Sequence, residues 1–296
     1  MLTDPAAWLA DVLADLAGGA AEAADPVNFR PLAIELDALG VHFIDAILGA
    51  RAYFHEGQAW NDPLDCDLAD LQPPDVAASP VMRGWLRLAA HVIAATGGRL
   101  MVTAPVLSSP INIAMNLFGQ RILEAMIERS AAADHALGVI ADTIIAATQA
   151  VLAAVAPQLL RCAVAQNRYA PAGFGYVDGC ATQMISAEHY RRFLAPLDAA
   201  ILGQYPCGGM MHLCGAHSQH IDAWREMKPL RSVQINDRAA DDFELYYRGL
   251  RQDQILYVSP TREMTLDRIL ALSGGRRVVI QAFSPGPIPT VRQGGV

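Results

Sequence analysis

A histidine and a cysteine stand two residues apart in the segment GGMMHLCG, which spans residues 208–215. The apolar residues around them predict a β-strand, and alternate residues of a strand point to the same face. An imidazole nitrogen and a thiolate sulfur are both good zinc ligands. The spacing therefore predicts that His212 and Cys214 face one site and bind a metal. A buried histidine beside an inert core cysteine would leave the same pattern.

Other residues near predicted strand ends are candidates for the same site. Gly209 and Gly215 flank the His-Cys pair and would let a substrate come close to the backbone. Asp178 ends a predicted strand and is a candidate acid, base or substrate anchor, or else the cap of the next helix. Tyr176 lies two residues before it, where it either lines the pocket or only packs.

A further pair of carboxylates lies earlier in the chain. Glu35 and Asp37 alternate in a short apolar stretch, so both can point to one face. We expect Glu35 to contact substrate; two solvated carboxylates are the alternative.

The elements that must position these residues alternate regularly from residue 85 onward. Strands are predicted at 100–105, 174–177, 209–213, 231–235, 255–258 and 278–282, with helices at 85–95, 131–155, 186–202, 218–227, 241–250 and 265–272. Such alternation is typical of parallel βα units. With 296 residues, it predicts a single (β/α)₈ TIM barrel over residues 1–296, with the site at the carboxyl ends of the strands.

The barrel is expected to carry three additions to the regular pattern. Residues 1–30 are predicted to form an N-terminal helical extension. Residues 51–80 are predicted to form a long loop or lid, in which Tyr53, His55 and Trp60 could cover the site. The segment after the last strand is atypically short for a barrel, which predicts that a second copy of the chain covers the gap in a homodimer.

The bulk composition restricts the class of protein. The chain is 53% hydrophobic and 18% charged with a net charge of -8, which predicts a large core and no binding of nucleic acid. The apolar run 139–156 contains Asp142, Thr143 and Gln149, so a buried helix is predicted and not a membrane span. Five scattered cysteines favour a reducing compartment, and we expect a cytoplasmic protein.

Several motifs together resemble the uroporphyrinogen decarboxylase superfamily. They are HLCG at 212–215, Ile221-Asp222, LRSV at 230–233, the segment 105–119 and the segment 178–196. The resemblance covers about residues 86–289 and implies a TIM barrel with its site at the barrel mouth.

The branch that this chain resembles most in motif is the zinc-dependent, corrinoid-linked methyltransferases. That resemblance implies zinc at His212 and Cys214, a small thiol that accepts a methyl group, and a corrinoid donor carried by a separate protein. The family's third ligand is a cysteine in a Ser-Pro-Gly-Cys-like turn after the last strand. Here the turn is SPGP, with Pro287 in that place. Asp237, Cys180 and His217 are the candidate replacements.

Two alternative functions remain open from the sequence. The same pocket could hold a metal-free decarboxylase or lyase for a small carboxylate or tetrapyrrole-like substrate, with Arg51, Arg168 or Arg238 as its anion anchors. The other alternative is a barrel that has lost its third ligand and serves as a non-catalytic binding subunit.

Overall fold

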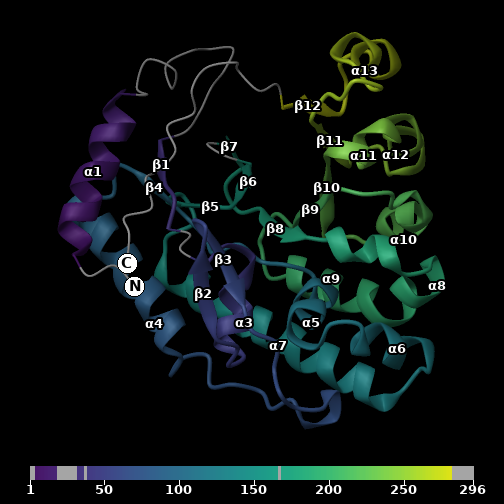
Figure 1. The fold of residues 1–296 in the computed structure, drawn as a ribbon. Coiled ribbons are helices and arrows are strands. Elements are labelled where there is room, and N and C mark those ends of the chain that lie inside the picture. The colour runs from purple at the N-terminus through teal and green to yellow at the C-terminus, as the bar shows by residue number, and fades with distance from the viewer. Residues whose placement is uncertain (1–3, 19–31, 37–38, 166–167, 282–296) are drawn as a thin grey trace.

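The computed structural model describes residues 4–18, 32–36, 39–165 and 168–281, and two parallel sheets form its framework (Figure 1). The first sheet has the order β1-β4-β5, formed by Ala33–Ile34, Met101–Thr103 and Leu160–Arg161. The second has the order β12-β11-β10-β9-β8. Its strands are β8 (Gly175–Asp178), β9 (Gly209–Leu213), β10 (Leu230–Ile235), β11 (Ile255–Val258) and β12 (Val278–Ile280).

The two sheets approach one another beside β8. Ser108, which follows β4, forms an isolated parallel bridge with Asp178 at the end of β8. Among the described residues no hydrogen-bonded ladder closes the two sheets into a barrel. The α/β class with parallel strands is therefore confirmed, whereas the closed (β/α)₈ barrel is not.

Helices connect the strands, as expected for parallel βα units. They are α1 (Pro5–Gly18), α3 (Phe43–Ile47), α4 (Pro80–Ala95), α5 (Pro110–Phe118), α6 (Arg121–Ile127), α7 (Ala131–Ala154), α8 (Ala187–His189), α9 (Ala195–Leu202), α10 (Ile221–Glu226), α11 (Asp237–Asp241), α12 (Phe243–Gly249) and α13 (Leu266–Ser273). In Figure 1, α10, α12 and α13 lie on the outer side of the five-stranded sheet.

Side-chain caps explain where several helices begin. Ser79 accepts a hydrogen bond from Met82 N, and Pro80 fits the first turn of α4 because that position needs no N–H. Ser130 caps α7 and Thr265 caps α13 in the same way. The α13 helix ends at Gly274, whose φ of 58° is left-handed and suits glycine.

The long helix α7 is apolar enough, by length and composition alone, to cross a membrane. Half of its most apolar window is buried inside the protein, where α7 packs against α5 and α9. A buried core helix passes the same test, which agrees with the helix predicted for this segment.

The prediction of an irregular loop at 51–80 is wrong in its first part. Strands β2 (Ala52–His55) and β3 (Gln58–Asn61) form an antiparallel hairpin there. Its two-residue turn has positive φ at both Glu56 (50°) and Gly57 (77°), the backbone that a tight hairpin turn of type I′ requires. Gly57, between Tyr53-Phe54 and Trp60, was the available signal for this hairpin. Tyr53 and Trp60 face each other across it and are exposed, so their function as a lid remains a prediction.

A second unexpected hairpin follows β5. It consists of β6 (Ala163–Ala165) and β7 (Arg168–Tyr169), paired antiparallel. The Val164 carbonyl oxygen lies within hydrogen-bonding distance of side chains from β8 and β10. This hairpin therefore contacts polar side chains inside the five-stranded sheet.

Candidate metal-binding site

Three potential metal ligands meet at the carboxyl ends of β8 and β9. The ligand atoms of Cys180, His212 and Cys214 all lie within 4.8 Å of one another. The two strands are parallel neighbours in which Asp178 pairs with His212, so the residues that follow each strand emerge side by side. Cys180 begins the 3₁₀ turn η3 (Cys180–Met184), and its Sγ lies 2.7 Å from Sγ of Cys214. Of the three replacement ligands considered, Cys180 is the one that belongs to this group.

His217 does not belong to the group, because both of its ring nitrogens have other partners. The backbone N–H of Gly215 donates to Nε2 at 3.2 Å, and Nδ1 lies 2.9 Å from Oγ1 of Thr182. That hydroxyl already donates to the Gly179 carbonyl, so it accepts from His217 Nδ1. Burial lowers the pKa of His217 to about 4, and the imidazole is therefore neutral and structural.

Asp237 also lies outside the group of three. It is exposed at the start of α11, immediately beyond β10, and its φ is 47°. Its negative charge is close enough to act on Cys214, where it opposes ionisation of the thiol. Asp237 is therefore an electrostatic neighbour of the site. Pro287, at the position where the resemblance implies a third ligand, lies outside the described residues.

The turn that carries Cys180 is held in place from two directions. The Ala181 N–H donates to Oδ1 of Asn112 in α5 at 3.0 Å. His220 Nε2 donates to the Thr182 carbonyl at 2.8 Å. The amide end of Gln183, an exposed side chain of the same turn, lies beside Gly215, where a Cβ would be. The contact of Gly215 with substrate remains a prediction.

Gln234 in β10 orients the His212 ring. Its Nε2 donates to the Val164 carbonyl at 3.1 Å, and a carbonyl can only accept, so the amide orientation is determined. Oε1 of Gln234 therefore faces Nδ1 of His212, 2.8 Å away, and accepts a hydrogen bond from the Nδ1–H group. His212 Nε2 is left as the nitrogen available to a metal, which is the arrangement typical of metal-bound histidines.

The two sulfur atoms differ in their tendency to ionise. Hydrogen bonds from Cys180 and then from His212 lower the pKa of Cys214 to about 5, against the opposing effect of burial. The same contact with Cys214, followed by burial, raises the pKa of Cys180 above its ordinary value. One thiolate therefore forms readily at neutral pH, and it lies beside a second thiol and an imidazole.

His212 itself is drawn toward the protonated form. Burial lowers its pKa, but the bond to Cys214, the charge of Asp178 and the bond to Gln234 outweigh it and raise the pKa above its ordinary value. Before a metal binds, the group therefore favours a thiolate–imidazolium pair. A divalent cation bound there would replace two protons, one from His212 and one from Cys180, and so leave the net charge unchanged.

Asp178 and Tyr176 lie next to this group on β8. The Asp178 charge acts on Tyr176, Cys180 and His212, so its carboxylate belongs to the immediate surroundings of the site. Tyr176 is buried, and its hydroxyl donates to Oε1 of Gln234 at 2.9 Å. Burial raises the pKa of Tyr176 well above its ordinary value. Tyr176 therefore helps to hold Gln234 in place, and its catalytic role remains a prediction.

Two predicted substrate residues lie apart from the group. Gly209 is at the opposite end of β9, where a Cβ would lie 2.7 Å from the Gly175 carbonyl oxygen and 2.7 Å from Leu202. Close packing of β8 and β9 thus gives this glycine a structural reason, and its contact with substrate remains a prediction. Glu35, just after β1, accepts a hydrogen bond from the Tyr169 hydroxyl at 3.0 Å, which associates it with the β6–β7 hairpin.

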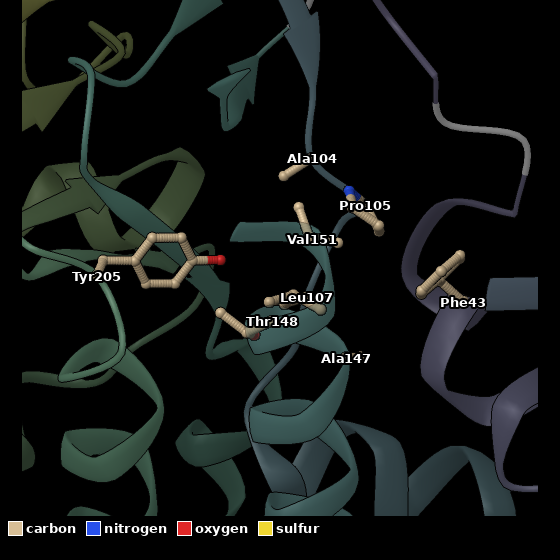
Figure 2. A pocket seen from close by; sticks show the side chains of 8 residues that line it. All are labelled: Phe43, Ala104, Pro105, Leu107, Ala147, Thr148, Val151 and Tyr205. Atoms are coloured by element: carbon tan, nitrogen blue, oxygen red, sulfur yellow. The ribbon is translucent and has the colours of Figure 1, made fainter. Parts of the chain in front are cut away.

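The enclosed cavity in Figure 2 is not the substrate site. It lies between the segment after β4 and α7, with Phe43 on one side and Tyr205 on the other. Its volume of about 10 Å³ admits roughly one water molecule. None of the candidate site residues lines it, and its lining is almost wholly apolar.

Several residues of the site were missed by the sequence analysis. Gln234 pairs directly with His212 in the sheet and is fully buried, together with Gln281, to which it donates at 2.9 Å. A glutamine inside the apolar run 230–235 was the available signal for it. Asn112, Thr182 and His220 carry no comparable signal, because only the folded chain brings them to η3.

Comparison with known proteins shows a shared fold. No protein-family model matches the chain, and no curated protein sequence matches it. Solved structures do match, in 22 chains. One is a methyltransferase from Methanosarcina mazei, with a TM-score of 0.64 and 14% sequence identity, covering 94% of this chain and 79% of that one. At this identity the likeness concerns the fold alone, and membership of the uroporphyrinogen decarboxylase superfamily remains a prediction. The chain is similar in its α/β architecture to a methyltransferase.

Proposed function

We propose that this chain is a zinc-dependent enzyme that transfers a methyl group to or from a small thiol. The observation that carries the proposal is the convergence of Cys180, His212 and Cys214 within 4.8 Å at the carboxyl ends of two adjacent parallel strands. Ligands of α/β folds bind at this edge. The methyltransferase with the same fold supports the reaction class.

The residues present fit zinc by their chemistry. Two sulfurs and one imidazole nitrogen form a soft donor set that zinc prefers over harder cations. Three protein ligands leave a fourth position open, as in catalytic zinc sites. Gln234 supplies the outer hydrogen bond that holds His212 Nε2 toward the ligand group. When bound there, zinc would lower the pKa of an acceptor thiol and so favour its nucleophilic thiolate.

The surrounding residues would accept the released proton and hold the metal ligands in position. We assign the Asp178 carboxylate, beside Cys180 and His212, to receive the proton that the acceptor thiol loses. Asn112 and His220 would keep η3, and with it Cys180, in place during turnover. The methyl donor in this proposal is a corrinoid carried by a separate protein.

The test measures metal content and methyl transfer in parallel. Protein purified under reducing conditions and loaded with zinc should hold one zinc per chain and demethylate free methylcobalamin with 2-mercaptoethanol as acceptor. His212→Ala, Cys214→Ser and Cys180→Ser should each lose most of the bound zinc and at least about 100-fold in rate, because each removes a direct ligand.

Cys207→Ser is the matched control, since Cys207 is an exposed thiol outside the ligand group. It should keep both its zinc and its rate. Full turnover in the His212→Ala and Cys214→Ser variants would refute the proposed function.

A further inference from the structure

The two sulfurs of the proposed zinc site lie unusually close together. Cys180 and Cys214 are both free thiols, yet their Sγ atoms are only 2.7 Å apart. Two thiolates on one tetrahedral zinc, with Zn–S bonds of about 2.3 Å, lie roughly 3.8 Å apart. A disulfide has an S–S bond of about 2.05 Å. The observed separation lies between these two values, so a small movement in either direction reaches one of them.

The backbone also suits a bond between these two cysteines. Each follows a paired strand residue by two positions, Cys180 after Asp178 and Cys214 after His212. Gly179 N–H extends this pairing by donating to the His212 carbonyl at 2.9 Å. The two segments are therefore still hydrogen-bonded to each other one residue before Cys180, and the two Sγ atoms already meet without any rearrangement of the backbone.

Small reagents can reach this pair. Cys180 and Cys214 are both partly exposed, whereas Cys162 is buried. An oxidant of low molecular weight could therefore meet the pair without unfolding of the chain.

We propose that Cys180 and Cys214 form a reversible disulfide that competes with zinc for the same two sulfur atoms. The oxidant is a small-molecule disulfide. One cysteine thiolate attacks it, forms a mixed disulfide and releases one small thiol. The second cysteine then attacks the mixed disulfide, so that the Cys180–Cys214 bond forms and a second small thiol leaves. In total the two cysteines lose two protons and two electrons, which the two released thiols carry.

The disulfide would make zinc binding depend on the oxidation state of Cys180 and Cys214. This inference rests on the proposed function, because it gives the zinc ligands a second state. Oxidation removes two of the three ligands, and His212 alone is too few to retain the metal. Bound zinc, conversely, occupies both sulfurs and should protect them from oxidation.

The test maps the bond directly in the full chain. Metal-free and zinc-loaded protein are each incubated with oxidised glutathione, remaining thiols are alkylated, and disulfide-linked peptides are identified by mass spectrometry. Metal-free protein should lose two of its five thiols, with a bond joining Cys180 to Cys214. Zinc-loaded protein should oxidise at least tenfold more slowly, and a zinc-binding dye should record one zinc released per disulfide formed. A reducing dithiol should restore zinc binding.

Controls separate this inference from the proposed function. Cys207→Ser should oxidise like the wild type, whereas Cys180→Ser should form no internal bond. Retention of all five thiols, or stable glutathione adducts without a Cys180–Cys214 bond, would overturn the inference and leave a zinc-binding site intact. If the disulfide forms but the protein never binds zinc, the proposed function is wrong, and so is the competition between zinc and the disulfide. The reversible Cys180–Cys214 bond would still be supported.

Discussion

At the scale of single residues, Gln234 decides which nitrogen of His212 is available. The Val164 carbonyl orients its amide, so its oxygen accepts a hydrogen bond from Nδ1–H of His212 at 2.8 Å. A ligand histidine without this partner would rotate and would exist in both neutral tautomers. A residue that touches no metal can thus control how well the metal binds.

Gln234→Leu should weaken zinc binding about 10- to 100-fold, the usual effect of removing an outer hydrogen bond from a ligand histidine. The measurement is a competition titration with a chromophoric chelator, with circular dichroism to verify the fold. Tyr176→Phe is the matched control, because it removes another hydrogen bond to Gln234 but leaves the one to His212. Zinc binding by Gln234→Leu at wild-type affinity would contradict this account.

At the scale of elements, the site depends on how η3 docks against the end of β9. Cys180 is carried by a turn and not by a strand, so its position follows from contacts of its neighbours. Asn112 holds the beginning of the turn, His220 holds its middle, and Gln183 covers Gly215. A methyl group at 215 would meet only the amide end of Gln183, which is exposed and can swing aside.

Asn112→Ala should therefore reduce zinc affinity, up to roughly tenfold, because it removes the hydrogen bond that holds the start of the turn bearing Cys180. Gly215→Ala should keep nearly the wild-type affinity, because the exposed Gln183 side chain can swing away from the new methyl group. The comparison uses the same chelator titration, and Gly138→Ala in α7 is the control, since nothing lies within 4 Å of a Cβ there. Wild-type affinity in Asn112→Ala would show that this hydrogen bond does not position Cys180.

At the scale of the whole molecule, a buried carboxylate links two segments, one that follows a strand of the first sheet and one that follows a strand of the second. Asp198 in α9, after β8, accepts hydrogen bonds from Ser109 at 2.8 Å and from Tyr190 at 2.9 Å. Ser109 follows β4 of the other sheet. Burial raises the pKa of Asp198 from 3.8 to about 7, although both hydrogen bonds oppose this rise.

Because the pKa of Asp198 is higher in the folded than in the unfolded chain, protonation of Asp198 favours the folded state. Its contribution to the free energy of unfolding is fully present below about pH 4. That contribution should be lost as the pH rises toward 7, by at most about 4 kcal/mol in the free energy of unfolding. Urea denaturation at a series of pH values gives the free energy of unfolding of the wild type and of Asp198→Asn. The difference between these two free energies should change over this interval, because asparagine remains neutral. Asp142→Asn, at an exposed position in α7, is the control. A constant difference between wild type and Asp198→Asn from pH 4 to 7 would disprove the assignment.

The sequence by itself determined most of the local structure. Strands β8 to β12 and helices α7 and α13 lie within about two residues of the bounds that the hydrophobic periodicity predicts, because that signal acts within a few residues. The helix α4 ends as predicted but begins earlier, at Pro80. Strand alternation also predicted that His212 and Cys214 face one site, and the structure brings them together. The β2–β3 hairpin was missed because its strands are short and largely exposed, which leaves no apolar alternation to detect.

Only the tertiary structure decided which residues complete the site. Cys180 joins His212 and Cys214 because β8 and β9 are neighbours in register, a pairing that spacing along the chain does not contain. His217, closer to Cys214 in sequence, is instead turned toward Thr182. Gly209 is close to His212 in the sequence, but it lies at the opposite end of β9. Ligand geometry arises from contacts between elements, and the periodicity of a single element cannot encode those contacts.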